Sequence, residues 1–246
     1  MPPLIGTAGW AIPAADRSSF PEDGTALQRY AAVMPCLEVN SSFHRPHRRS
    51  TWERWAASVP DGFRFSAKIP KEISHVRRLV DATDALGRFL GEASGLGGKL
   101  SVILLQLPPS FPFDAPVVSS FLAAASSLTD ARIACEPRHA SWFTHEADAL
   151  LVGHEVARVA ADPARVPDAA RPGGWRGLTY RRMHGSPVMY RSAYGEERLR
   201  SYANEIEEDL AAGRPTWCIF DNTASSAALG DALNLIKLLE PSSLES

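Results

Sequence analysis

The stretch RIACE, residues 132–136, decides the fold when it is compared with six other segments that end in the same way. Each segment is a short apolar or β-branched run that finishes on a polar or charged residue. An eighth run, LIGTAGW at residues 4–10, opens the chain. The seven segments are CLEVN ending at Asn40, FRFSAK at Lys68, SVILLQ at Gln106, RIACE at Glu136, VARVAAD at Asp162, LTYRRMH at His184 and WCIFDN at Asn222.

Apolar residues at helical spacing fill most of the gaps between these runs. Strands that alternate with helices indicate an α/β protein, and 246 residues are close to the roughly 250 of a closed barrel. We therefore expect a single TIM-type (β/α)8 barrel over residues 1–240, a disordered tail over 241–246, and an irregular loop over 163–175, which holds three prolines. The expected helices span residues 25–34, 51–57, 81–96, 115–128, 196–212 and 225–239.

The composition excludes several classes of protein. No apolar run reaches the ~18 residues that a membrane span needs. The N-terminus has no basic segment followed by an apolar stretch, so no signal peptide is expected. Cys36, Cys135 and Cys218 form no CxxC pair, which favours a reduced, cytoplasmic protein.

Positive charge is concentrated in one segment of a chain whose net charge is −2. Residues 44–78 contain nine Lys and Arg against three acids, a balance of +6 that leaves −8 for the rest. This segment either steers an anionic ligand towards the protein or forms a solvated surface whose arginines cover apolar neighbours.

Side chains two apart on a strand share a face, so each polar set is expected to point into the barrel. Buried charges need partners. We expect a lower layer of structural ion pairs formed by Arg64, Arg132, Arg158 and Glu38. We expect an upper layer that binds a ligand at the C-terminal ends of the strands, where barrel enzymes have their active sites. Its members are Asn40, Lys68, Gln106, Glu136, Asp162, His184 and Asn222.

The chain resembles the YecE-like family of domains of unknown function, block by block and in order. The matching blocks are IGTAGW (5–10), EVNSSFHRP (38–46), FRFSAKIPKEISH (63–75), LLQLPPSF (104–111), CEPRHASW (135–142), RRMHG (181–185) and FDNTASSAALGDALNL (220–235). The resemblance implies a one-domain TIM barrel and no established reaction. It adds Arg45, His75, Arg138, His139, Trp142 and Arg182 to the polar positions. The chain departs from the family at His44, where tyrosine is commoner, and at Asp221, where asparagine is commoner. Alternation predicts that Asp221 faces the helices.

The residue types suggest roles. Glu136 and Asp162 are the expected general base and acid, provided that burial raises one pKa. His184 would carry a proton and Lys68 would complete the catalytic set, with Lys68 and Arg182 binding a phosphate or carboxylate. Trp10, Phe43 and Trp142 would form the pocket walls or pack in the core. The expected substrate-binding residues are Asn40, Arg45, His75, Gln106, Arg138, His139, Trp142, Arg182 and Asn222.

Three functions follow from this set. The first is a hydrolase-like enzyme acting on a small anionic substrate, a nucleotide or a nucleic acid. The second is a non-catalytic module that binds a ligand or nucleic acid. The third is a metal-dependent enzyme acting on carbohydrates, with Glu38, Glu136, Asp162 and His184 as ligands. Lys68 and Arg182 would compete for those carboxylates, so neither a metal site nor a cofactor is predicted. The oligomeric state is not predicted.

Overall fold

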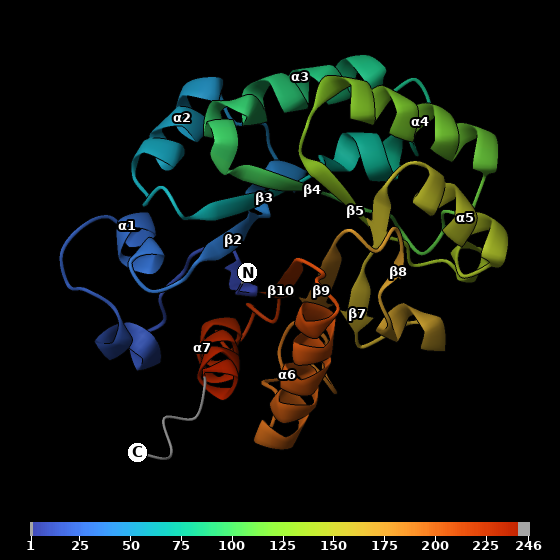
Figure 1. The fold of residues 1–246 in the computed structure, drawn as a ribbon. Helices are drawn as coiled ribbons and strands as arrows, with labels where there is room; N and C mark the ends of the chain where they lie inside the picture. Colours follow the sequence, from blue (N-terminus) through green and yellow to red (C-terminus); the bar gives the residue numbers. More distant parts are fainter. Residues whose placement is uncertain (1, 241–246) are drawn as a thin grey trace.

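Parallel strands follow one another in chain order around a barrel, with helices on the outside (Figure 1). The computed structural model describes residues 2–240, and the tail over 241–246 lies outside them. The first strand pairs with the last, which brings the two ends of the described chain together and confirms the predicted barrel. The ring consists of β1 (Leu4–Ala8), β2 (Cys36–Val39), β3 (Arg64–Lys68), β4 (Leu100–Gln106), β5 (Arg132–Glu136), β6 (Val156–Arg158) with β7 (Ala160–Asp162), β9 (Thr179–Met183) and β10 (Thr216–Phe220).

The sixth strand position is divided in two. β6 pairs with β5, whereas β7 pairs with β9. The following segment holds only the 3-10 turn η6 (Pro167–Ala170) and β8 (Gly173–Gly174), which pairs antiparallel with β6. The predicted irregular loop is therefore confirmed, and the outer face of β7 has no α-helix of its own between α5 (His145–Gly153) and α6 (Glu196–Ala211).

The remaining connections each contain an α-helix. α1 (Ala26–Ala31) begins with a capping box, in which the Thr25 hydroxyl accepts from the Gln28 amide and the Gln28 side chain accepts from the Thr25 amide. Within residues 2–240, no helix combines the length and apolar character of a membrane span. The other helices that pack around the barrel are α2 (Arg49–Ala57), α3 (Thr83–Ala93), α4 (Ala115–Leu128) and α7 (Ala228–Leu239). Short 3-10 or π turns add η1 (Ala14–Ser19), η2 (Ser41–Phe43), η3 (Glu72–Val76), η4 (Ser94–Lys99) and η5 (Ala140–Trp142).

The lower half of the barrel interior is apolar, so the predicted lower layer of ion pairs is wrong. Arg158 points outward to Asp148, 3.2 Å away. Arg64 donates to backbone carbonyls, and Arg132 lies over the Trp175 ring. Glu38 pairs instead with an arginine higher in the barrel. The lower interior is filled by Cys36, Val102, Leu104, Ala134, Ala157, Val159, Leu178, Tyr180, Trp217 and Ile219.

Two strands face the opposite way from the prediction. Ala161 lies level with Arg182 on β9, and both face inward, so Asp162 faces outward. On β10, Ile219 lies level with the same arginine, which turns Asp221 inward and Asn222 outward. Polar residues therefore do not mark the inner face of these strands.

Gly6 is required where β1 approaches β2. A Cβ atom at this position would lie 2.2 Å from the Cys36 carbonyl oxygen, which is backbone and cannot move aside easily. We expect Gly6→Ala to lower the free energy of unfolding by about 3 kcal/mol or more in urea denaturation. Gly87→Ala is the control, because its Cβ would meet nothing within 4 Å, and we expect it to stabilise α3 by up to about 1 kcal/mol. Equal stability of the two variants would contradict this packing.

Candidate active site at the barrel mouth

Arg182, at the end of β9, holds three buried carboxylates together. Its Nε and Nη2 atoms donate to both oxygens of Glu38, at 3.0 and 2.7 Å. Nη1 donates to Glu136 at 2.7 Å, and Nη2 also reaches Asp221 at 3.0 Å. The guanidinium is fully buried, so these charge-assisted bonds are its only compensation for lost water. Burial alone would lower the Arg182 pKa, but Glu38, Asp221 and Glu136 hold it well above its usual value.

Glu136 has both oxygens occupied by donors. Oε2 accepts from Arg182 and from the Gln106 amide at 2.9 Å, while Oε1 accepts from Arg138 Nε at 2.9 Å. Burial raises the pKa of this carboxyl, but Arg182, His184 and Arg138 together hold it well below its usual value. The condition for Glu136 to act as a general acid, a raised pKa, is not met. Glu136 is an ionised group that orients its neighbours.

His184 lies between two carboxylates. Its Nδ1 atom is 3.0 Å from Asp221 Oδ2, and its Nε2 atom is 3.1 Å from Glu136 Oε1. Burial lowers the pKa of this imidazole, but Glu136 and the bond to Asp221 raise it overall. A neutral imidazole can donate to only one of the two carboxylates, so the geometry favours the imidazolium. The prediction that Asp221 faces the helices is wrong, because the alternation of this strand was assigned the wrong way round.

Lys68, at the end of β3, differs from Arg182 and His184 because it contacts no carboxylate of the described part of the chain. Its ammonium lies 4.2 Å from the centre of the Phe43 ring, and no carboxylate of residues 2–240 is within salt-bridge distance. Burial, helped by the charge of Arg182, lowers the Lys68 pKa to about 8. The neighbouring strand ends at Asn40, whose buried Oδ1 atom has no hydrogen-bond partner among the described residues. A cationic donor and an amide acceptor therefore lie unpaired at adjacent strand ends.

The charges of this cluster balance only if His184 is neutral. Glu38, Glu136 and Asp221 give three negative charges, and the three positive charges belong to Lys68, Arg138 and Arg182. A protonated His184 leaves one positive charge in excess.

Loops narrow the entrance to this cluster. A small cavity of about 10 Å³ lies beside Glu136 and His184 and is also lined by Pro163 and Met189. The Tyr190 hydroxyl is 3.4 Å from Arg138, and the Tyr190 ring meets His184 edge-on. Tyr190 carried no signal in the sequence, because it lies in an irregular segment after β9. This cavity is about the size of one water molecule, so a larger ligand must displace these loop residues.

Some predicted ligand-binding residues support the fold instead. Trp142 is fully buried, donates to the Phe111 carbonyl and packs against Phe113, so it forms no pocket wall. His139 caps η5 through its ring nitrogen, which accepts from the Ser141 amide. Asn222 donates to Asp231 on α7 and to the Ser192 carbonyl. The expectation that Asn222 faces the mouth is wrong.

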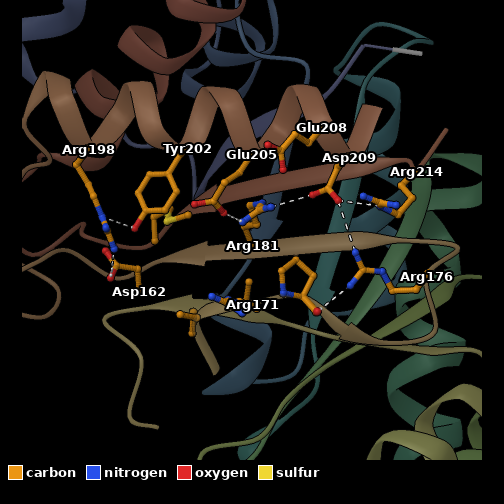
Figure 2. A pocket seen from close by; sticks show the side chains of 15 residues that line it. Asp162, Arg171, Arg176, Arg181, Arg198, Tyr202, Glu205, Glu208, Asp209 and Arg214 are labelled. Atoms are coloured by element: carbon orange, nitrogen blue, oxygen red, sulfur yellow. Dashed lines mark hydrogen bonds and ion pairs between the residues drawn. The ribbon is translucent and has the colours of Figure 1, made fainter. Parts of the chain in front are cut away.

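Asp162 lies outside the barrel, in a groove of about 440 Å³ between β7, β9 and α6. Figure 2 shows it beside Arg198 and Tyr202 of α6, with an Arg198–Asp162 distance of 3.2 Å. Further along the groove, Arg181 binds Asp209 at 2.8 Å. These pairs seat α6 on the sheet where a covering helix is absent. The predicted acid and base pair of Glu136 and Asp162 is therefore not assembled at one place.

A second groove, of about 540 Å³, lies between η2 and α3, and we call it the α3 groove. Arg45 lines it, together with Lys71, Arg88 and the half-buried Phe43 ring. The three cations have no acidic partner among the described residues, although Glu72 and Glu92 also line the groove. His75 contacts the same Phe43 ring edge-on, and the Lys68 ammonium also lies against this ring.

The residues considered for a metal do not form a ligand set. Arg182 binds both Glu38 and Glu136, and Asp162 faces outward. In the part of the chain that the structure describes, no three His, Cys, Asp or Glu side chains are arranged to hold a metal ion.

The fold and the polar mouth define a TIM-barrel protein, and comparison with known proteins gives its family. A family model described as "Protein of unknown function DUF72" matches residues 4–245, so the chain belongs to the DUF72 family. It is 32% identical over 174 residues to the UPF0759 protein YecE of Escherichia coli strain K12, a match that covers 68% of this chain and 61% of YecE. The match therefore spans less than two thirds of that relative.

Two crystal structures share the fold. A DUF72 family protein of Enterococcus faecalis V583 superposes with a TM-score of 0.79 at 18% identity, over 96% of this chain and 95% of that protein. A DUF72 family protein of Thermotoga maritima gives a TM-score of 0.78 at 23% identity, over 97% of this chain and all of that protein (100%). These likenesses confirm the barrel and give no reaction.

Removal of Arg182 tests the cluster. Arg182→Met would leave Glu38, Glu136 and Asp221 buried without their shared cation, and we expect a loss of about 3–5 kcal/mol of unfolding free energy. Arg200→Ala, which breaks an exposed pair with Glu196 on α6, should cost at most about 0.5 kcal/mol. Denaturant titrations of both variants measure the difference. A cost below about 1 kcal/mol for Arg182→Met would show that the network is not needed for stability.

Proposed function

We propose that the barrel mouth binds a small anionic substrate and that Lys68 and His184 transfer protons during its conversion. The observation that carries the proposal is the Lys68 ammonium, which is buried at a strand end without a carboxylate. Arg138 and the excess charge of protonated His184 add to the same attraction.

The chemistry assigned to each group follows from its partners. Glu136 and Asp221 are held ionised by Arg182 and cannot donate protons near neutral pH. The raised pKa of His184 favours its charged form, which can donate a proton, whereas Lys68 can lose one near pH 8. A hydrolase-like reaction remains part of this proposal, with His184 in place of the carboxylate acid.

The α3 groove favours a second candidate, the binding of a nucleic acid without catalysis. Its unpaired cations Arg45, Lys71 and Arg88 suit phosphates, and the Phe43 ring can stack on a base. The two candidates use different arginines, and they can therefore be separated by mutation.

The proposal predicts anion binding that weakens as pH rises. The ligands would be sulfate and small carboxylates, whose own charge does not change between pH 6.5 and 9. Above pH 6.5, protons leave Lys68, whose pKa is about 8, and His184, whose pKa is raised. Each loss removes a positive charge, so we expect about tenfold weaker binding at pH 9, or about 1.4 kcal/mol. Isothermal calorimetry measures this directly.

Two matched variants assign the site. Arg138→Gln should weaken binding of the small anion about tenfold, whereas Arg88→Gln in the α3 groove should leave it unchanged. A labelled single-stranded oligonucleotide serves as the alternative ligand. Salt-sensitive oligonucleotide binding that is lost in Arg88→Gln, without any small-anion binding, would contradict the mouth and favour the second candidate.

A further inference from the structure

We propose that Lys68 is a nucleophile that forms an imine with a small carbonyl compound carrying a carboxylate or phosphate group. This inference rests on the proposed anion site and adds the substrate class. The first observation is that Arg182 binds the three carboxylates of the mouth. Arg182 takes Glu38 through two bonds and also binds Glu136 and Asp221, so each of these carboxylates is already committed.

Arg182 therefore occupies these carboxylates and Lys68 has none of them within salt-bridge distance, and only Lys68 of the two cations can lose its proton. A guanidinium stays charged in proteins, and Arg182 is fixed by four hydrogen bonds. Lys68, which is 6% exposed, has an aromatic face in place of a carboxylate. A lysine in a desolvated site beside another cation is activated as a nucleophile. With a pKa of about 8, roughly half of the Lys68 amine is neutral at pH 8, against well under 1% for an ordinary lysine.

The surrounding groups suit imine formation. His75 contacts the Phe43 ring, and burial together with the charge of Lys68 lowers its pKa, which leaves a neutral imidazole that can accept a proton. His184, placed between two carboxylates that favour its charged form, can donate one. The unpaired Oδ1 atom of Asn40, at the strand end next to Lys68, can accept from the hydroxyl of a tetrahedral intermediate.

The reaction balances without an oxidant or a metal. The Lys68 ammonium first gives up a proton, and the neutral amine attacks the carbonyl carbon. The carbonyl electron pair moves to oxygen, which takes a proton, while the attacking nitrogen loses one of its protons, and a neutral carbinolamine forms. A second proton on that oxygen lets it leave as water while the carbon–nitrogen double bond forms. The ammonium and the carbonyl compound are thus converted to one protonated imine and one water.

Arg138 determines the kind of carbonyl compound. Its side chain lies at the entrance, near the Tyr190 hydroxyl, and is 13% exposed, so it can reach a carboxylate or phosphate in solution. Glyoxylate, pyruvate and dihydroxyacetone phosphate are suitable probes, because each joins a carbonyl to an anionic group.

Borohydride trapping tests the inference, since it reduces an imine to a stable amine at the lysine that formed it. The chain has only four lysines, Lys68, Lys71, Lys99 and Lys237, so peptide mass spectrometry can compare them all. With each probe at pH 8, we expect at least tenfold more adduct at Lys68 than at the exposed Lys71 and Lys237. Lactate, which has the anionic group of pyruvate but no ketone, should reduce the pyruvate adduct at Lys68 and leave the surface lysines unaffected.

Lys68→Arg removes the nucleophile and keeps a positive charge at this position. We expect the folded variant to form no adduct above that of the surface lysines. If the variant does not fold, lactate competition in the wild-type protein still decides the matter. Anion binding by the wild type with no preference for Lys68 would overturn the imine and leave the anion site intact. If the wild-type protein neither binds small anions nor forms an adduct preferentially at Lys68, the anion site and the imine are both overturned.

Discussion

The ion cluster around Arg182 is the interaction on which the barrel mouth depends. One guanidinium, fully buried, joins carboxylates from β2, β5 and the end of β10, which are far apart in the sequence. Separately, each carboxylate would be expensive to bury. Together they form a rigid polar layer above an apolar lower barrel, and this layer positions His184, Gln106 and Arg138.

This constraint determines which groups remain available for chemistry. The carboxylates are saturated by donors, so the usual use of paired acidic residues does not apply at this mouth. The positive groups Lys68 and His184 are left, one poorly compensated and the other bridging two anions. The two larger grooves lie outside the barrel, and the one beneath α6 is lined by arginine–carboxylate pairs (Figure 2). The mouth itself combines buried charges with two titratable groups whose pKa values are shifted.

The sequence predicted the barrel and most strand ends correctly, because apolar runs and turns repeat in a regular order. The prediction of which side chains point into the barrel was wrong for two strands, and the reason is physical. Arg158, Asp162 and Asn222 were expected inside because they are polar, yet helices on the outside offer them Asp148, Arg198 and Asp231. Because these partners lie elsewhere in the sequence, the residues around each polar side chain give no pattern that shows which way it faces. On β10 both faces are apolar, so alternation could not show that Asp221 points inward.

The protonation state of His184 is the most direct test of the claim that the mouth carries an excess positive charge. Nitrogen NMR of the labelled imidazole between pH 5.5 and 9 reports both ring nitrogens. We predict that the midpoint for loss of the second ring proton lies above pH 6.5, because Glu136 and the bond to Asp221 raise the pKa of His184 in spite of its burial. Asp221→Asn should lower that pKa. A midpoint at or below pH 6.5, with one ring nitrogen already unprotonated there, would contradict the account.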